Sequence, residues 1–110
     1  AEQLGSQLSQ EDVCVISGLA RGIDARAHRG ALQGSGGTIA VQGCGIDQIY
    51  PRENRKLAEQ ILAHERGCIL TEFPLGSLPL GWHFPQRNRI ISGLSQGVIV
   101  VQAQINHPRA

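Results

Sequence analysis

The chain has few aromatic residues, no methionine and almost no net charge. Its 110 residues include one Trp, one Tyr and two Phe, and the formal net charge is +1. This balance excludes a protein that holds nucleic acid through an overall positive charge. We find no signal-peptide pattern and no apolar run as long as a membrane span. These absences predict a cytoplasmic protein without membrane contact.

Cysteine is also scarce, and several common site motifs are missing. The three cysteines form no Cys-x-x-Cys pair, and no histidine is spaced to complete a zinc site. We expect reduced thiols, with Cys14 and Cys68 buried in strands and Cys44 in a glycine loop, where a nucleophilic role is the minor alternative. There is no Walker-type Gly-Lys-Ser/Thr, and the Gly-Cys-Gly at 43–45 lacks the third glycine of a dinucleotide fingerprint. The sequence therefore predicts no metal and no cofactor.

Positive charge is nevertheless concentrated in two stretches. Residues 21–29 carry three Arg and one Asp, and residues 82–93 carry two Arg and no acid. Residues 1–13 carry only acidic charges. Clustered arginines favour a local contact with an anionic partner.

Short apolar runs alternate with amphipathic segments along the chain. Strands are expected at residues 13–16, 38–41, 68–71 and 98–101. Helices are expected at residues 1–10, at 24–33, from Pro51 to near Gly67, and at 85–94. Leu4 and Leu8 lie one turn apart in the first helix, and the third has one face made of Leu57, Ala58, Ile61 and Leu62. In the last helix, Ile90, Ile91 and Leu94 are expected to face inward. This alternation predicts an α/β fold, a parallel sheet with right-handed crossovers and helices on both faces.

Both ends of this single domain, residues 1–110, are expected to be truncated. A helix leads in without a strand before it, and no helix follows the expected fourth strand.

The stretch 13–28 contains the clearest functional unit. An apolar run ends at Ser17-Gly18, and Asp24, a good N-cap residue, precedes an alanine-rich helix. A strand, a small-residue turn and a helix N-terminus together bind anions in open α/β sheets. Because parallel strands end at one edge, the loops at 17–23, 42–50 and 72–84 are expected to converge there.

Two long motifs carry a family resemblance. One is Ser-Gly-Leu-Ala-Arg-Gly-Ile-Asp at 17–24, followed by Ala27-His28. The other is Phe-Pro-Gln-Arg-Asn-Arg-Ile-Ile-Ser-Gly-Leu-Ser at 84–95. Tyr50-Pro51 with Asn54, and Thr-Glu-Phe-Pro at 71–74, lie between them. Over roughly residues 13–101 the chain resembles the central part of the Rossmann-like domain of the DNA-processing protein A (DprA/Smf) family.

The resemblance implies a role in natural transformation. Proteins of this family bind incoming single-stranded DNA, protect it and load the RecA recombinase onto it, without chemistry on the strand. It also implies a homodimer for the full-length protein.

The residues that we expect to contact DNA follow from the resemblance and from their chemistry. They are Ser17, Gly18, Arg21, Phe84, Arg87, Asn88 and Arg89. Arg21 and Arg87 are expected to contact phosphate, which suits a charged fork, with free N–H groups at the helix starts assisting. Phe84 is expected to stack on an unpaired base. Ser17 and Gly18 are expected to bring the backbone close to a ligand.

Each of these residues also has a structural alternative. Arg21 would pair with Asp24, Arg89 with Glu72 or Asp24, and Asn88 would brace its loop. Phe84 would pack on its own helix, and Trp82 would form a small core for its loop. His28 is expected to be a buried packing residue.

Two other functions remain open from the sequence. The first is a nucleotide-hydrolysing enzyme of the same architecture, in which Asp24, Asp47 and Glu72 meet at the sheet edge. The second is a scaffold that recruits a protein partner and contacts DNA little. A salt titration separates phosphate contacts from the scaffold.

Overall fold

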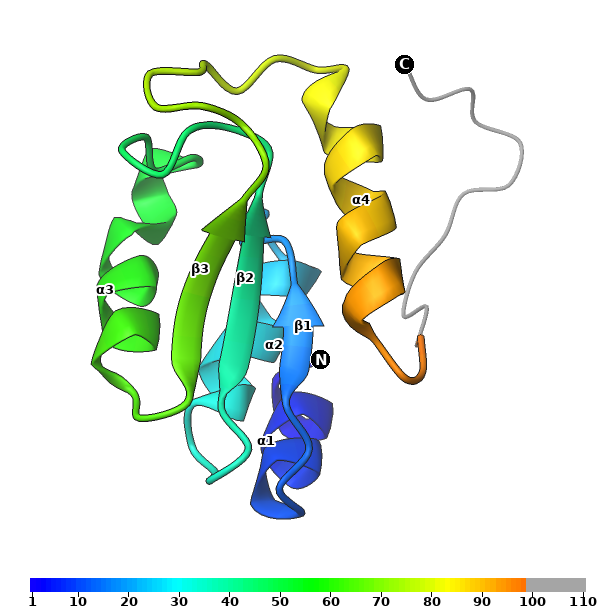
Figure 1. Cartoon of the computed structure of the whole chain (residues 1–110). Coiled ribbons are helices and arrows are strands. Elements are labelled where there is room, and N and C mark those ends of the chain that lie inside the picture. Colours follow the sequence, from blue (N-terminus) through cyan, green and yellow to red (C-terminus); the bar gives the residue numbers. More distant parts are fainter. Residues whose placement is uncertain (99–110) are drawn as a thin grey trace.

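A three-stranded parallel sheet lies at the centre of the structure, a computed structural model that describes residues 1–98 (Figure 1). Its strands are β1 (Val15–Ser17), β2 (Thr38–Gln42) and β3 (Gly67–Thr71), side by side in chain order. In the register of the sheet, Ile16 pairs with Ile39, and Ile39 with Cys68. The first three expected strands are thus confirmed, and all three end at the same edge of the sheet. We call this side of the molecule the carboxyl edge.

Helices flank the sheet and connect its strands. They are α1 (Glu2–Gln10), α2 (Ile23–Ala31), α3 (Arg55–Ala63) and α4 (His83–Leu94), and the short 3₁₀ turn η1 (Arg52–Asn54) precedes α3. Figure 1 shows α2 behind the sheet, α3 beside β3, and α4 next to β1. The expected α/β architecture is therefore present.

The main core lies between the sheet and the two crossover helices α2 and α3. It joins Ala40 of β2 with Ala25 of α2 and with Leu57, Ala58 and Ile61 of α3. Side chains alternate along a strand, so Val41 points to the opposite face, where α4 packs and leaves it fully buried. This second contact holds α4 against the ends of β1 and β2.

Several sequence-based boundaries and burials were wrong. Strand β1 begins at Val15, two residues later than expected, and this leaves Cys14 exposed. Leu94, which was expected to face inward, is 50% exposed. Leu62 is 61% exposed, although it was placed on one face with the buried Leu57 and Ile61. Of the expected fourth strand, residues 98–101, only Val98 lies within the described residues.

Helix α1 packs against α2 through small residues. Leu4 is exposed, whereas Gly5 and Ser9 are buried against α2. A Cβ on Gly30 of α2 would lie 1.9 Å from the carbonyl oxygen of Glu2, and a Cβ on Gly5 would lie 2.5 Å from that of Ala27. The two helix backbones therefore touch through small residues, which leucines cannot do.

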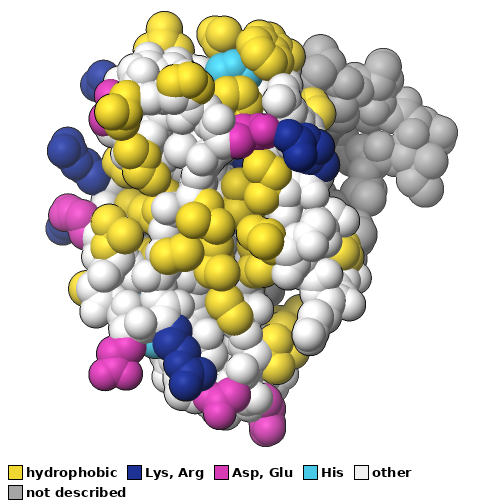
Figure 2. Space-filling view, in the orientation of Figure 1, with side chains coloured by type: hydrophobic (Ala, Val, Ile, Leu, Met, Phe, Trp, Pro, Cys, Tyr) yellow, Lys and Arg dark blue, Asp and Glu magenta, His cyan; other side chains and the backbone are white. Residues whose placement is uncertain are grey.

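Apolar side chains gather over the middle of the sheet face seen in Figure 2. Leu70 of β3 is among the exposed apolar residues, and its register partner Val41 is buried. None of the helices in residues 1–98 is long and apolar enough to cross a bilayer.

Candidate nucleic-acid interface

The loops that follow the three strands meet at the carboxyl edge, as expected. The turn after β1 contacts the β2–α3 connection, because Asn54 Nδ2 donates to the carbonyl oxygen of Leu19 over 2.9 Å. The loop after β3 also reaches that connection, where the N–H of Gly76 donates to Asp47 Oδ1 over 2.8 Å. Residues far apart in sequence thus build one surface.

Arg87 lies beneath this surface. Only 7% of it is exposed, and its Nη1 donates to the carbonyl oxygens of Gly18 and Val41 over 2.8 and 3.0 Å. Its Nε donates to Asn88 Oδ1 over 2.8 Å. The guanidinium therefore fastens α4 to the ends of β1 and β2. The side chain is buried and its Nη1 and Nε already have acceptors, so in this structure Arg87 supports the edge, and the phosphate contact expected for it stays a prediction.

Residue 18 must be a glycine because the guanidinium of Arg87 packs directly against its backbone. A Cβ at residue 18 would lie 2.2 Å from Arg87 Nη1 and 2.5 Å from its Cζ, both inside van der Waals contact. The N–H of Gly18 donates to Asp24 Oδ2 over 2.9 Å. This glycine was expected to let a ligand approach the backbone closely, and in the structure the guanidinium of Arg87 makes that close approach.

Asp24 does not cap its helix, contrary to expectation. The N-cap of α2 is Gly22, with φ of 77°, and Asp24 lies within the first turn. Its carboxylate instead holds the N–H of Gly18 at the end of β1. A negative charge in this first turn also opposes an anion at the start of α2.

The turn after β1 is held in an unusual conformation. Leu19 is fully buried with φ of 62°, in the left-handed region that branched and bulky residues seldom adopt. Its N–H donates to His28 Nε2 over 3.2 Å, and its carbonyl accepts from Asn54. These two bonds fix the turn that presents Arg21.

His28 is a buried packing residue, as expected. Its Nε2 accepts from Leu19, so the ring proton is on Nδ1, which donates to Thr38 Oγ1 over 2.7 Å. The Thr38 hydroxyl in turn donates to the Val15 carbonyl over 2.6 Å. Burial lowers the pKa of His28 to about 4, with Arg87 acting in the same direction and Asp24 against it.

Arg21 is exposed at the surface of this turn. Its Nε donates to Glu53 Oε1 over 2.5 Å, and its Cζ lies 5.8 Å from the centre of the Tyr50 ring. The partner is therefore Glu53 of η1 rather than Asp24. Hydrogen bonding of the charged guanidinium to Glu53, and then to Tyr50, raises the pKa of Arg21.

Phe84 is half-buried between two other side chains. Its ring centre lies 5.9 Å from that of Tyr50 and 5.5 Å from Arg87 Cζ. A Cβ on Gly43 would lie 3.0 Å from Phe84 Cδ1, so the ring packs on the loop after β2 as well as near its own helix. Arg21, Tyr50, Phe84 and Arg87 therefore form a continuous row at the carboxyl edge.

Tyr50 is the site residue that the sequence analysis did not select. It is 39% exposed and touches both Arg21 and Phe84. The signal available in the sequence was its place in the family motif before Pro51. Its neighbours come from the turn after β1 and from α4, so pattern alone could not place its ring.

A second aromatic group lies in the loop before α4. The rings of Phe73 and His83 stack at 3.9 Å, and Trp82 meets His83 edge-on at 4.0 Å. His83 Nδ1 donates to the Gly43 carbonyl over 2.8 Å. Trp82 remains 63% exposed, so this small core forms around His83 rather than around the indole.

Arg89 and Asn88 lie on the exposed side of α4. Arg89 Nη2 donates to Glu72 Oε2 over 2.5 Å, which confirms the ion pair expected for it. The side-chain oxygen Oδ1 of Asn88 accepts a hydrogen bond from Arg87 Nε and so braces that arginine. The two arginines of the motif point apart, one to the sheet and one to the loop after β3.

The start of α4 has little capacity for an anion. The N–H groups of His83 and Phe84 donate to the carbonyls of Leu80 and Gly81, and Pro85 has no N–H. The expected assistance from free helix N–H groups is therefore wrong for this helix. Ser17, at the end of β1, is half-buried.

The carboxylates named for an enzyme are each held by a different partner. Asp24 accepts from Gly18, Asp47 from Gly76, and Glu72 from Arg89. Cys44 is buried and its thiol donates to the Gln48 carbonyl, and burial raises the pKa of that thiol. A high thiol pKa disfavours a nucleophilic cysteine.

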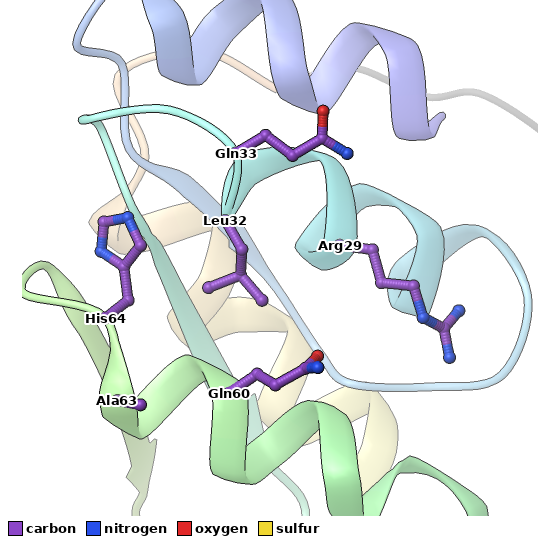
Figure 3. A pocket seen from close by; sticks show the side chains of 6 residues that line it. All are labelled: Arg29, Leu32, Gln33, Gln60, Ala63 and His64. Carbon is purple, nitrogen blue, oxygen red and sulfur yellow. The ribbon is translucent and has the colours of Figure 1, made fainter.

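A separate hollow of about 430 Å³ opens between α2 and α3 (Figure 3). Its lining consists of Arg29, Leu32, Gln33, Gln60, Ala63 and His64. These residues belong to the C-terminal ends of two crossover helices, which lie at the amino ends of the strands. The hollow is therefore remote from the carboxyl edge.

Comparison with known proteins identifies relatives over nearly the whole chain. The model of the family described as DNA recombination-mediator protein A matches residues 1–107. Protein Smf of Escherichia coli is 51% identical over 89% of this chain and 26% of its own length. DNA processing protein DprA of Bacillus subtilis is 46% identical over 92% of this chain and 33% of its own. The chain thus spans about a quarter to a third of these curated relatives.

Solved structures agree with this assignment. DNA processing protein A of Streptococcus pneumoniae superposes with a TM-score of 0.82 at 45% identity, over 96% of this chain and 36% of that one. DNA processing protein A of Helicobacter pylori, which binds single-stranded DNA, superposes with a TM-score of 0.78 at 34% identity, over 96% of this chain and 49% of that one. By fold, motifs and sequence match, the chain belongs to the DNA recombination-mediator protein A (DprA/Smf) family.

Proposed function

We propose that this chain binds single-stranded DNA at the carboxyl edge of its sheet. The observation that carries the proposal is the row in which exposed Arg21 lies over Tyr50 and Tyr50 lies beside Phe84. Aromatic faces next to an arginine suit a strand whose bases are unstacked and whose phosphates are accessible. The single-stranded DNA binding of the Helicobacter pylori relative supports the same assignment.

The candidate residues divide into contacts and supports. Arg21 and Arg89 are exposed and would supply charge to the phosphates, and Phe84 with Tyr50 would supply stacking. Arg87 is a positioning residue, because it holds the end of β1 against α4 through the carbonyl of Gly18. Gly18 and Asn88 accept hydrogen bonds from Arg87, Gly18 below the surface and Asn88 on the exposed side of α4, and Ser17 precedes Gly18 at the end of β1.

The wider role follows from family membership and is part of the proposal. The protein would act in the cytoplasm during natural transformation, protect incoming single strands and help to load the RecA recombinase. It would work as a homodimer and perform no chemistry on the DNA.

A second candidate function is a protein-binding scaffold, favoured by the loop before α4. Leu75, Leu78 and Leu80 of this loop are all exposed together with Trp82. Exposed apolar residues in one loop are a feature of protein interaction sites.

Fluorescence anisotropy of a labelled single-stranded oligonucleotide, titrated with the chain at several salt concentrations, tests the proposal. Saturable binding that weakens linearly in log salt and exceeds binding to a duplex supports DNA recognition through phosphates. A chain that is folded by circular dichroism and leaves the anisotropy unchanged contradicts the proposal and favours the scaffold.

A further inference from the structure

The two exposed arginines of the proposed interface each already hold a carboxylate. Arg21 binds Glu53 of η1, and Arg89 binds Glu72 after β3, both at 2.5 Å. The first pair joins the turn after β1 to the β2–α3 connection, and the second joins α4 to the loop after β3.

Arginines elsewhere on the described surface behave differently. Arg26 and Arg29 of α2 and Arg55 of α3 are exposed, and within residues 1–98 none of them forms an ion pair. Arg66 contacts Asp12 at the opposite edge of the sheet, over a longer 3.7 Å. Close carboxylate partners are therefore found where we place the DNA backbone, and not on the arginine-bearing faces of α2 and α3.

A carboxylate and a phosphate compete for the same guanidinium. Both present oxygens that accept paired N–H groups of the planar fork, so one arginine edge cannot serve both at once. Exposed ion pairs contribute little to stability, and a DNA phosphate can therefore displace the carboxylate.

Arg21 keeps a second support when its carboxylate leaves. Its guanidinium carbon lies 5.8 Å from the Tyr50 ring centre, and this contact does not depend on Glu53. Cation–π attraction holds the guanidinium near the ring in the absence of a salt bridge. The side chain is thus positioned for phosphate beside the stacking surface.

We infer that Glu53 and Glu72 are intramolecular competitors of the DNA backbone, which occupy Arg21 and Arg89 until phosphates replace them. This inference rests on the proposed function. The two acids lower the affinity of the interface for isolated anions, whereas a strand carrying several phosphates displaces both carboxylates together. They are specificity-determining residues that favour a polyanion.

Three charge-removing variants test the competition. We expect Glu53→Gln and Glu72→Gln each to bind the labelled single strand about two- to fivefold more tightly at low salt. The factor is small because an exposed ion pair is weak, so that its loss frees the arginine at little energetic gain. The matched control is Glu59→Gln, an exposed acid of α3 without an ion pair in residues 1–98, and it should change affinity less than twofold. Equal tightening in all three variants would mean a general effect of net charge, and this would overturn the inference.

A double-mutant cycle gives the sharper result. If Glu53 acts by occupying Arg21, then Glu53→Gln must lose its effect in an Arg21→Gln background. An unchanged gain in that background contradicts the inference.

The failure of the proposed function is distinguishable from the failure of this inference. Absence of binding by both the folded wild type and Glu59→Gln refutes DNA recognition itself. Binding by wild type that Glu53→Gln and Glu72→Gln do not improve refutes only the competition.

Discussion

The guanidinium of Arg87 lies directly against Gly18, with Nη1 2.8 Å from the carbonyl oxygen of Gly18 and 2.2 Å from the position that a Cβ there would take. On the other side of the same residue, the N–H of Gly18 donates to Asp24. The first and second family motifs therefore meet at Gly18. This contact decides the shape of the carboxyl edge, because it joins the turn after β1 to α4.

Substitutions at these two positions should be strongly coupled. Arg87→Ala leaves the buried carbonyls of Gly18 and Val41 without their donor and should cost about 2–4 kcal/mol of unfolding free energy. Gly18→Ala drives a methyl group into the guanidinium and should cost about 1–3 kcal/mol. The double variant should cost at least about 1 kcal/mol less than the sum, since the methyl group then has no guanidinium to meet. Urea denaturation of the four proteins measures this, and strict additivity would contradict the contact.

The free energy of unfolding should fall as the pH drops below 7, because His28 is held neutral in the fold. Its pKa is about 4 in the fold against an ordinary 6.5, so the folded state favours the neutral ring and the unfolded state takes up the proton first. The contribution of neutral His28 to the free energy of unfolding is complete above pH 6.5 and is lost as the pH falls from 6.5 towards 4. Between pH 7 and pH 5 the loss should be about 2 kcal/mol.

Denaturant unfolding at several pH values checks this expectation, with His28→Gln as the test variant and His64→Gln as the control. The acid loss should shrink in the first and persist in the second. A wild-type curve that is flat between pH 7 and pH 5 would show that His28 is not held neutral.

Two glycines in helices should respond to alanine in opposite ways. Gly30 of α2 meets the Glu2 carbonyl, so Gly30→Ala must separate α1 from α2 and should cost about 1–3 kcal/mol. A Cβ on Gly93 of α4 would meet no neighbouring atom within 4 Å, so Gly93→Ala should stabilise by about 0.5–1 kcal/mol through helix propensity. Thermal unfolding should therefore give a lower midpoint for the first and a higher one for the second.

The salt dependence of DNA binding should distinguish a residue that stacks on bases from a residue that contacts phosphate. Phe84→Ala should weaken binding by about 1–3 kcal/mol while leaving the slope of log affinity against log salt unchanged. Arg21→Gln should reduce that slope by about 0.7, as the loss of one single-strand phosphate contact requires. Arg29→Gln, in the hollow between α2 and α3, is the control and should do neither. Equal slopes for Arg21→Gln and wild type would remove Arg21 from the interface.

Much of the fold was readable from local pattern. The three described strands follow β-branched runs, and the helices follow apolar spacing with glycine and proline at their ends. The Arg89–Glu72 pair and the buried His28 were also predicted. The face that α1 buries was not predicted, because close helix contact through Gly5 depends on the partner helix.

The sequence by itself determined the α/β alternation, the edge at which the loops gather and the family motifs, because these depend on residue order and on short-range periodicity. Only the tertiary structure decided which arginine is buried and which is exposed. Arg87 and Arg21 have the same chemistry, but one meets the carbonyls of Gly18 and Val41 and the other meets Glu53 and Tyr50. Those partners lie between 29 and 69 residues away in sequence. Contacts at such separations arise when the parallel strands align their ends, and a local pattern contains no information about them.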